Sequence, residues 1–88
     1  MRIWFKFYKK GRLVKDNTVE DFSELNRTKK IFAAVDKVCM EEDLSHPTWL
    51  EKNIDEFKRS SKTRFTQDSF IDEIDFDFME ISVLEEDY

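Results

Sequence analysis

The residues of this chain that could do chemistry are first of all carboxylates near its C-terminal end. Asp75 and Asp77 would point to the same side of an extended strand, and Asp72 closely precedes them. Converging carboxylates are the ligands that Ca²⁺ and Mg²⁺ prefer in proteins. The segment lacks the spacing of a calcium-binding EF-hand loop and contains no glycine. We therefore expect these acids to form a solvated strand face, not a metal site.

The second candidate chemistry involves Cys39 and His46, the only cysteine and the only histidine. A zinc site needs more nitrogen and sulfur ligands than these two residues supply. One cysteine and one histidine would be enough for a Cys–His nucleophilic pair. However, Cys39 falls in an apolar helical pattern, where cysteine is most often a small hydrophobic residue. Phosphate-binding loops need several glycines and the chain has one. We expect no enzyme, no catalytic or metal-binding residue and no cofactor.

Aromatic and basic residues gather at the N-terminal end, where Trp4 and Tyr8 share a strand side with Arg2 and Lys6. Aromatic residues on sheets stack bases in several RNA-binding modules. The glycine-aromatic motif of those modules is absent here, and an acidic neighbouring strand would repel phosphate. Another protein is therefore the expected partner, and nucleic acid is not. The candidate interaction surface consists of Trp4, Tyr8, Asp72, Asp75 and Asp77.

The composition predicts one domain over residues 1–88, with residues 85–88 as a frayed tail. Charged residues make up 40% of the chain, but nine Phe, two Trp and two Tyr supply enough apolar surface for a folded core. The net charge of −5 is unevenly spread, because all nine acids after residue 65 lie in a stretch without any Lys or Arg. Such asymmetry bears on partners, not on the fold.

A single cysteine excludes a disulfide within the chain, and a reducing cytoplasm is the expected location. The N-terminal apolar run is interrupted by charges and has no small-residue cleavage site, so it does not read as a signal peptide. No run approaches the length of a membrane span, and no membrane contact is expected.

The first half of the chain predicts a hairpin followed by a helix. Residues 1–8 alternate as a strand, residues 9–12 form a turn at Gly11, and a weaker strand runs from 12 to about 19, with a bulge or an early end at residues 16–17. A helix is expected from Thr28 to Asp43, with Lys29, Lys30 and Lys37 on its solvent side.

The second half predicts another helix and a long strand. Pro47 suits the first helical turn, with Ser45 or Thr48 as its cap, and residues 59–62 close the helix. A short strand is expected at residues 64–66 and a turn at 67–69. Residues 70–84 read as one long strand with a bulge near residues 78–79, or as a central strand covered on both faces at its far end. The predicted sheet core consists of Ile3, Phe5, Phe7, Ile74, Phe76 and Phe78.

This order, β-β-α-α-(β)-β, indicates an α+β fold: an antiparallel sheet of three or four strands with two helices packed on one face. Opposite charges on facing strand positions favour pairing. Because Arg2 and Lys6 would face Asp75 and Asp77, the first and last strands are expected to be neighbours. Their pairing would be antiparallel if residues 64–66 form a strand, and parallel otherwise.

Three stretches carry a likeness to known proteins: the opening MRIWFKFYKKGRLV, the segment SHPTWLEKNIDEF and the acidic-aromatic ending FIDEIDFDFMEI. Through them the chain resembles the small, acidic, uncharacterised accessory proteins of conjugative transposons from Gram-positive anaerobic bacteria. The resemblance implies no specific activity. It implies an accessory role in a mobile element, including defence against host restriction systems.

We expect a non-enzymatic module that binds another protein through its sheet face or a sheet edge. The alternative is an acidic DNA mimic that inhibits a DNA-binding protein, because DNA itself presents a dense row of negative charge. A small metal-dependent enzyme is the third alternative. A homodimer that pairs two free sheet edges is a further arrangement that the pattern leaves open.

Overall fold

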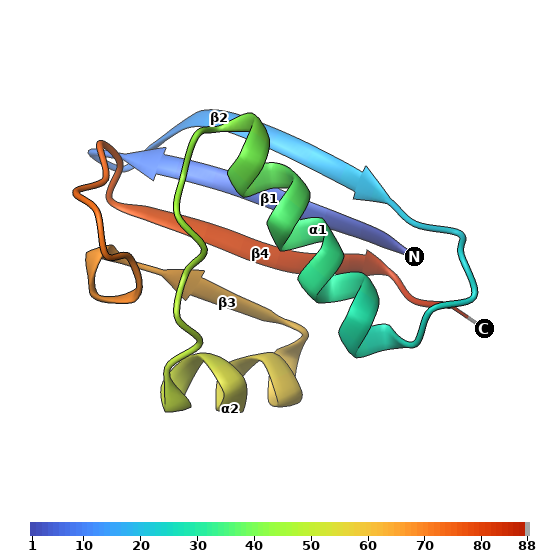
Figure 1. The fold of residues 1–88 in the computed structure, drawn as a ribbon. Helices are drawn as coiled ribbons and strands as arrows, with labels where there is room; N and C mark the ends of the chain where they lie inside the picture. Colours follow the sequence, from blue (N-terminus) through green and yellow to red (C-terminus); the bar gives the residue numbers. More distant parts are fainter. Residues whose placement is uncertain (88) are drawn as a thin grey trace.

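The computed structural model describes residues 1–87 and shows one four-stranded antiparallel sheet with two helices on one of its faces (Figure 1). This arrangement confirms the predicted α+β fold. The strand order is β2-β1-β4-β3, so the first and last strands pair at the centre, as predicted. The elements in chain order are β1 (Arg2–Lys9), β2 (Arg12–Glu20), α1 (Arg27–Glu41), α2 (Glu51–Ser60), β3 (Lys62–Phe65), a 3-10 turn (Gln67–Ser69) and β4 (Phe78–Glu85).

The predicted hairpin at the N-terminus is confirmed, and Gly11 adopts the positive φ of 75° that its turn requires. Phe7 pairs with Lys15 whereas Tyr8 pairs with Leu13, so Val14 is the extra residue of a bulge. The prediction of a bulge or an early end at residues 16–17 was wrong, because both residues keep regular partners on β1. The bulge places Leu13 opposite Tyr8.

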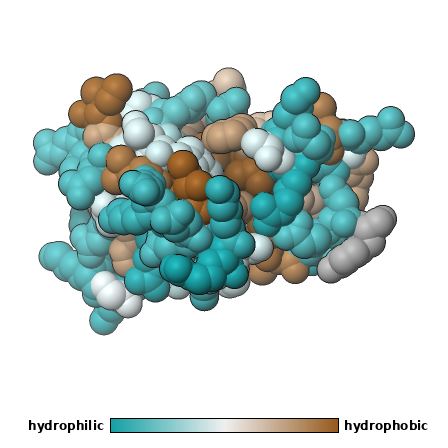
Figure 2. Space-filling view, turned by 90° about the horizontal axis from the view of Figure 1, so that it is seen from below, coloured by the Kyte–Doolittle hydropathy of each residue, from teal (hydrophilic) through white to brown (hydrophobic). Residues whose placement is uncertain are grey.

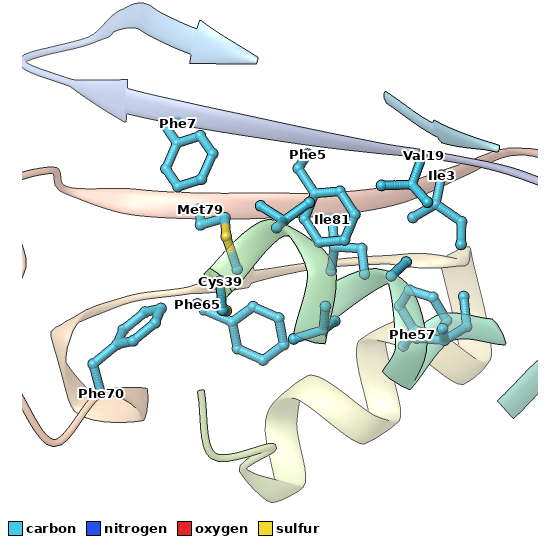
Figure 3. Packing of buried hydrophobic residues seen from close by; sticks show 14 of the residues in the cluster. Ile3, Phe5, Phe7, Val19, Cys39, Phe57, Phe65, Phe70, Met79 and Ile81 are labelled. Carbon is cyan, nitrogen blue, oxygen red and sulfur yellow. The ribbon is translucent and has the colours of Figure 1, made fainter. Parts of the chain in front are cut away.

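The core lies between the sheet and the helices (Figure 3). Phe5 and Ile81 are fully buried on the two central strands, Phe65 comes from β3, and Val38 and Cys39 come from α1. Matching apolar residues face each other across the strands, which removes the most apolar surface from water. The alternation predicted for β1 is confirmed, since Ile3, Phe5 and Phe7 are all buried.

Helix α1 begins after Asn26, whose side-chain oxygen accepts a hydrogen bond from the backbone N–H of Lys29 (2.9 Å). The apolar stripe predicted for this helix is confirmed. The placement of Lys30 in solvent was wrong, because only 2% of Lys30 is exposed. Its ammonium group forms an ion pair with Asp87 and donates a hydrogen bond to the carbonyl of Asp21. A helix pattern alone does not reveal that a distant acid will cover a lysine.

Helix α2 begins at Glu51, not at Pro47, and neither Ser45 nor Thr48 caps it. The buried side chain of Asn53 accepts a hydrogen bond from the N–H of Leu50 (3.0 Å) and donates one to the carbonyl of Arg64 (2.9 Å). One amide therefore both caps the helix and ties it to β3. The N–H of Thr48 is bound to the carbonyl of Ser69, which holds the preceding segment outside the helix.

The prediction of one long strand over residues 70–84 was wrong in its first half. Residues 70–77 contain no strand, and β4 begins at Phe78 without a bulge at residues 78–79. We call residues 70–77 the acidic loop. Its shape is set by the side-chain amide of Gln67, which accepts a hydrogen bond from the N–H of Ile74 (2.9 Å) and donates one to the carbonyl of Asp72 (2.8 Å).

Three apolar residues that were predicted to share one core face are in fact divided. Phe76 is buried and packs edge-on against Phe7, at 5.0 Å between ring centroids, whereas Ile74 is only half-buried at the margin of the core. Phe78 lies on the other side of the sheet. The change of phase after Phe78 therefore marks the start of a strand. The alternative was right that β4 is a central strand but wrong that it is covered on both faces: the helices cover the side of Met79 and Ile81, and Glu80 on the other side is shielded by the side chains of Lys6 and Arg64.

Among residues 1–87, no helix is long and apolar enough to cross a membrane.

Candidate protein-binding surface

The face of the sheet that points away from both helices is built by the alternate residues of all four strands. The register of the strands places these residues in rows that run across the sheet. We call this side the open face. Its central members are Trp4, Lys6, Tyr8, Leu13, Asp16, Arg64, Phe78 and Glu80.

The middle row of the open face consists of alternating charges, one from each strand: Asp16, Lys6, Glu80 and Arg64. The Nζ of Lys6 and the Nε of Arg64 each lie 3.0 Å from a different oxygen of the Glu80 carboxylate. Glu80 is 8% exposed, so the pairing satisfies a carboxylate that the sheet holds largely out of water. Opposite charges on facing positions also favour the observed order of the strands.

The electrostatic state of Glu80 follows from two opposing effects. Burial by itself raises the pKa of the carboxyl group, but hydrogen bonds and charge from Lys6 and Arg64 outweigh it and lower the pKa overall. Glu80 is therefore ionised at neutral pH. The two cations are in turn held in fixed positions on the open face.

Aromatic rings flank this charged row. Tyr8 stacks on Phe78, with ring centroids 4.9 Å apart and an angle of 24° between the planes, and Leu13 faces Tyr8 from β2. The guanidinium group of Arg64 lies 4.5 Å from the ring centroid of Phe78. Tyr8 and Phe78 are half-buried and Leu13 is exposed, so an apolar row lies beside the charges.

Trp4 stands on the opposite side of the charged row. The ammonium group of Lys6 lies 4.2 Å from the Trp4 ring centroid, and the indole Nε1–H of Trp4 donates a hydrogen bond to Asp16 (3.0 Å). Each aromatic ring of the open face thus has a partner that limits its rotation. A surface of this kind loses little side-chain entropy when it binds another molecule.

The five residues predicted as an interaction surface fall into two groups. Trp4 and Tyr8 lie on the open face, whereas Asp72, Asp75 and Asp77 belong to the acidic loop. Asp77 accepts a hydrogen bond from the backbone N–H of Lys10 (2.8 Å) and so holds the loop against the hairpin turn.

The predicted pairing of the first and last strands is correct, but the acids that face the two cations are not the predicted ones. Lys6 faces Glu80, and Arg2 faces Glu85, where Asp75 and Asp77 were expected. The phase change at Phe78 contained the information needed to find Glu80. If Met79 and Ile81 face the core, Glu80 must face the other way.

The carboxylates of the C-terminal quarter do not form one continuous row. Glu80 is paired on the open face, Glu86 with Arg27, and Asp87 with Lys30. The acidic loop lies at the other end of β4 and its carboxylates are exposed. The acids are therefore divided into two groups. In the group on β4 and after it, the negative charges of Glu80, Glu86 and Asp87 are each paired with a cation.

The two remaining residues with reactive side chains are Cys39 and His46. Cys39 is fully buried, and desolvation raises the pKa of its thiol to about 11, so the thiolate is scarce at neutral pH. His46 is exposed and lies 3.1 Å from a carboxylate oxygen of Asp36. Within residues 1–87, no group of three or more His, Cys, Asp or Glu side chains is placed to hold a metal ion.

Comparisons with known protein families, with curated proteins and with solved structures find no match. The function of the chain must therefore be argued from its own surfaces.

Proposed function

We propose that this chain is a non-enzymatic module that binds another protein through the open face. The observation that carries the proposal is the rigid combination of Trp4, Tyr8 and Arg64 on an uncovered sheet. Tryptophan, tyrosine and arginine are the residues that most often dominate binding energy in protein interfaces. The core does not require Trp4, Tyr8 and Arg64, because these residues lie on the side of the sheet that faces away from it.

A protein suits this face better than a nucleic acid does. The charged row contains two cations and two carboxylates, and both cations are bound to Glu80. A nucleic-acid surface needs an excess of cations that are free to displace counterions from phosphates. A partner that presents apolar side chains next to alternating charges would match the rows of the open face.

The proposal is tested by capturing partners with the parent chain and with Leu13→Asp. Leu13 is 47% exposed and adjoins Tyr8, so a charge there should disturb binding while leaving the fold intact. Met40→Asp is the matched control, because Met40 is an 82% exposed apolar residue on α1. We expect a specific partner to be lost with Leu13→Asp and kept with Met40→Asp, as measured by quantitative mass spectrometry after both variants are shown to be folded. Equal recovery with both variants would exclude the open face.

Two further measurements test the other classes of function. Fluorescently labelled single-stranded DNA and RNA should show no binding that depends on Trp4 and Tyr8. Titration with Mg²⁺, Mn²⁺ and Ca²⁺ should leave the melting temperature unchanged, since a metal site would stabilise the folded state by mass action. A melting shift with any of these ions would favour the metal-dependent enzyme.

The DNA-mimic alternative rests on the acidic loop alone, because the remaining acids are divided and partly paired with cations. It predicts binding to a basic DNA-binding protein that weakens steeply with salt. Replacing Asp72, Asp75 and Asp77 together by Asn should then abolish binding, whereas binding through the open face should survive.

A mobile-element setting, proposed from the sequence resemblance, predicts relaxase or integrase genes beside the coding sequence.

A further inference from the structure

An apolar groove of about 280 Å³ lies between α1 and α2, on the helical side of the molecule. Figure 2, which views the molecule from below, where α2 lies in Figure 1, shows hydrophobic atoms exposed between hydrophilic ones. The apolar residues that line the groove are Ile31, Phe32, Trp49, Ile54 and Phe57.

The walls of this groove are held in place by aromatic contacts. The ring of Trp49 packs edge-on against Phe32 and Phe57, at 5.9 and 5.4 Å between centroids. It also contacts the fully buried Phe65, at 4.9 Å. The part of the groove that Trp49 and Phe57 form is therefore anchored to the core.

The charged residues that line the groove are both cations, Arg27 and Lys58. Arg27 is bound to Glu86, whereas Lys58 is exposed and takes part in no ion pair among residues 1–87. No carboxylate lines the groove. Its chemistry suits an apolar side chain that is flanked by negative charge.

The acidic loop presents such a side chain. Ile71 is 90% exposed, the highest value among the exposed large hydrophobic residues, and it does not enter the groove of its own chain. Asp72 and Glu73 follow it directly and, like Asp75, form no ion pair within residues 1–87. The conformation of the loop is nevertheless held by two contacts: Gln67 forms hydrogen bonds with its backbone, and Phe76 is buried in the core.

We propose that Ile71 of one copy inserts into the groove of a second copy, with the carboxylates of the acidic loop beside Lys58. This single contact explains both an exposed isoleucine in an acidic loop and an unfilled apolar groove with a basic rim. The two surfaces differ, so the contact is head-to-tail: each copy offers one loop and one groove, and chains or rings can form. The contact area of one loop is small, so association is weak and rises with protein concentration. The proposal is independent of the open face.

Sedimentation equilibrium of the parent chain, from micromolar to millimolar concentration, measures this association. We expect the average mass to rise without a plateau at the dimer, and the rise to weaken as salt screens the charges. Ile71→Asp removes the inserting side chain, and Ile54→Glu places a carboxylate in the groove; each should reduce the protein to a monomer. Met40→Asp, which changes an exposed apolar residue outside both surfaces, should associate like the parent. Lys58→Glu serves as a second groove variant if Ile54→Glu does not fold.

Mixing the two variants gives the decisive result. Ile71→Asp retains its groove and Ile54→Glu retains its loop, so an equimolar mixture should form a heterodimer and nothing larger. A parent chain whose mass does not rise with concentration would overturn the proposal. So would a mass that stops at the dimer and is unaffected by Ile71→Asp, which would indicate two copies paired along a sheet edge or face instead.

Discussion

The two faces of the sheet are made by alternate residues of the same strands, yet they are held by different forces. The covered face places Ile3, Phe5 and Phe7 against apolar partners on β4, and contact with the helices excludes water. The open face places charges opposite charges, and its aromatic rings remain half-buried. Burial of apolar area supplies most of the stability of a small domain. Partly hydrated ion pairs supply much less.

This difference separates the residues that the core requires from those that it does not. A residue on the covered face cannot be changed without creating a cavity or a clash, so its identity is set by folding. Trp4 and Tyr8 on the open face are larger than a solvated sheet requires, and their rings are fixed by Lys6 and Phe78. The packing of the core does not require their size, and the following variants test this division between the two faces.

The largest effect should come from Phe5, which is fully buried at the centre of the covered face. Phe5→Ala removes buried apolar surface and leaves a cavity, which should lower the free energy of unfolding by about 3–5 kcal/mol. Phe22→Ala is the control, because Phe22 is 73% exposed, and it should change stability by less than about 0.5 kcal/mol. Urea denaturation of both variants measures the difference. Similar midpoints would mean that the covered face does not dominate stability.

The next effect concerns Glu80, the centre of the open face. Glu80→Gln removes the charge that balances Lys6 and Arg64, and we expect a loss of about 1–3 kcal/mol because the largely buried Lys6 loses its partner, whereas Arg64 remains exposed to water. Glu86→Gln breaks an ion pair that is more exposed, with Arg27, and should cost at most about 1 kcal/mol. Equal costs in the same denaturation experiment would show that the charged row is no more than an ordinary surface ion pair.

The charged row should also make stability depend on pH. The pKa of Glu80 is lowered in the folded state, so between the folded and unfolded values the unfolded chain binds more protons. Stability is then fully present above the ordinary glutamate pKa of about 4.3 and is lost as pH falls through the lower folded value. Asp21 and Asp87 have lowered pKa values as well and add to the same trend. Thermal melts from neutral to acidic pH should show a smaller decline for Glu80→Gln than for the parent.

The smallest effect should be that of Asp77→Asn. The carboxylate of Asp77 accepts a hydrogen bond from the backbone N–H of Lys10, and an asparagine oxygen can accept the same bond. We expect a change of less than about 0.5 kcal/mol, whereas Asp77→Ala, which removes the acceptor, should cost more. If Asn and Ala are equally harmful in urea denaturation, the negative charge itself holds the acidic loop to the hairpin.

Much of the fold was readable from local pattern. The two-residue period over Ile3, Phe5 and Phe7 identified β1 and its buried side, and the helical spacing of Ile31, Val35 and Val38 identified α1. Charge complementarity also gave the correct neighbours in the sheet, even though Glu80 and not Asp75 or Asp77 is the acid that faces Lys6. For the candidate surface, the alternation of β1 placed Trp4 and Tyr8 on the open face.

The tertiary structure alone decided the features that depend on residues far apart in the chain. Residues 70–77 have the alternation of a strand, but Phe76 finds its place against Phe7 in the core, and the backbone of the loop is bound by Gln67 instead of a neighbouring strand. Lys30 is buried because Asp87, from the other end of the chain, lies beside it. The sequence by itself determined β1 and α1, whose apolar periods agree with the packing of the whole domain. The side of the sheet that Glu80 faces follows from the phase of Met79 and Ile81. The strand boundary at Phe78 and the partners of Glu80 were decided by the packing of four strands, since local pattern cannot specify which distant partner completes a hydrogen bond or an ion pair.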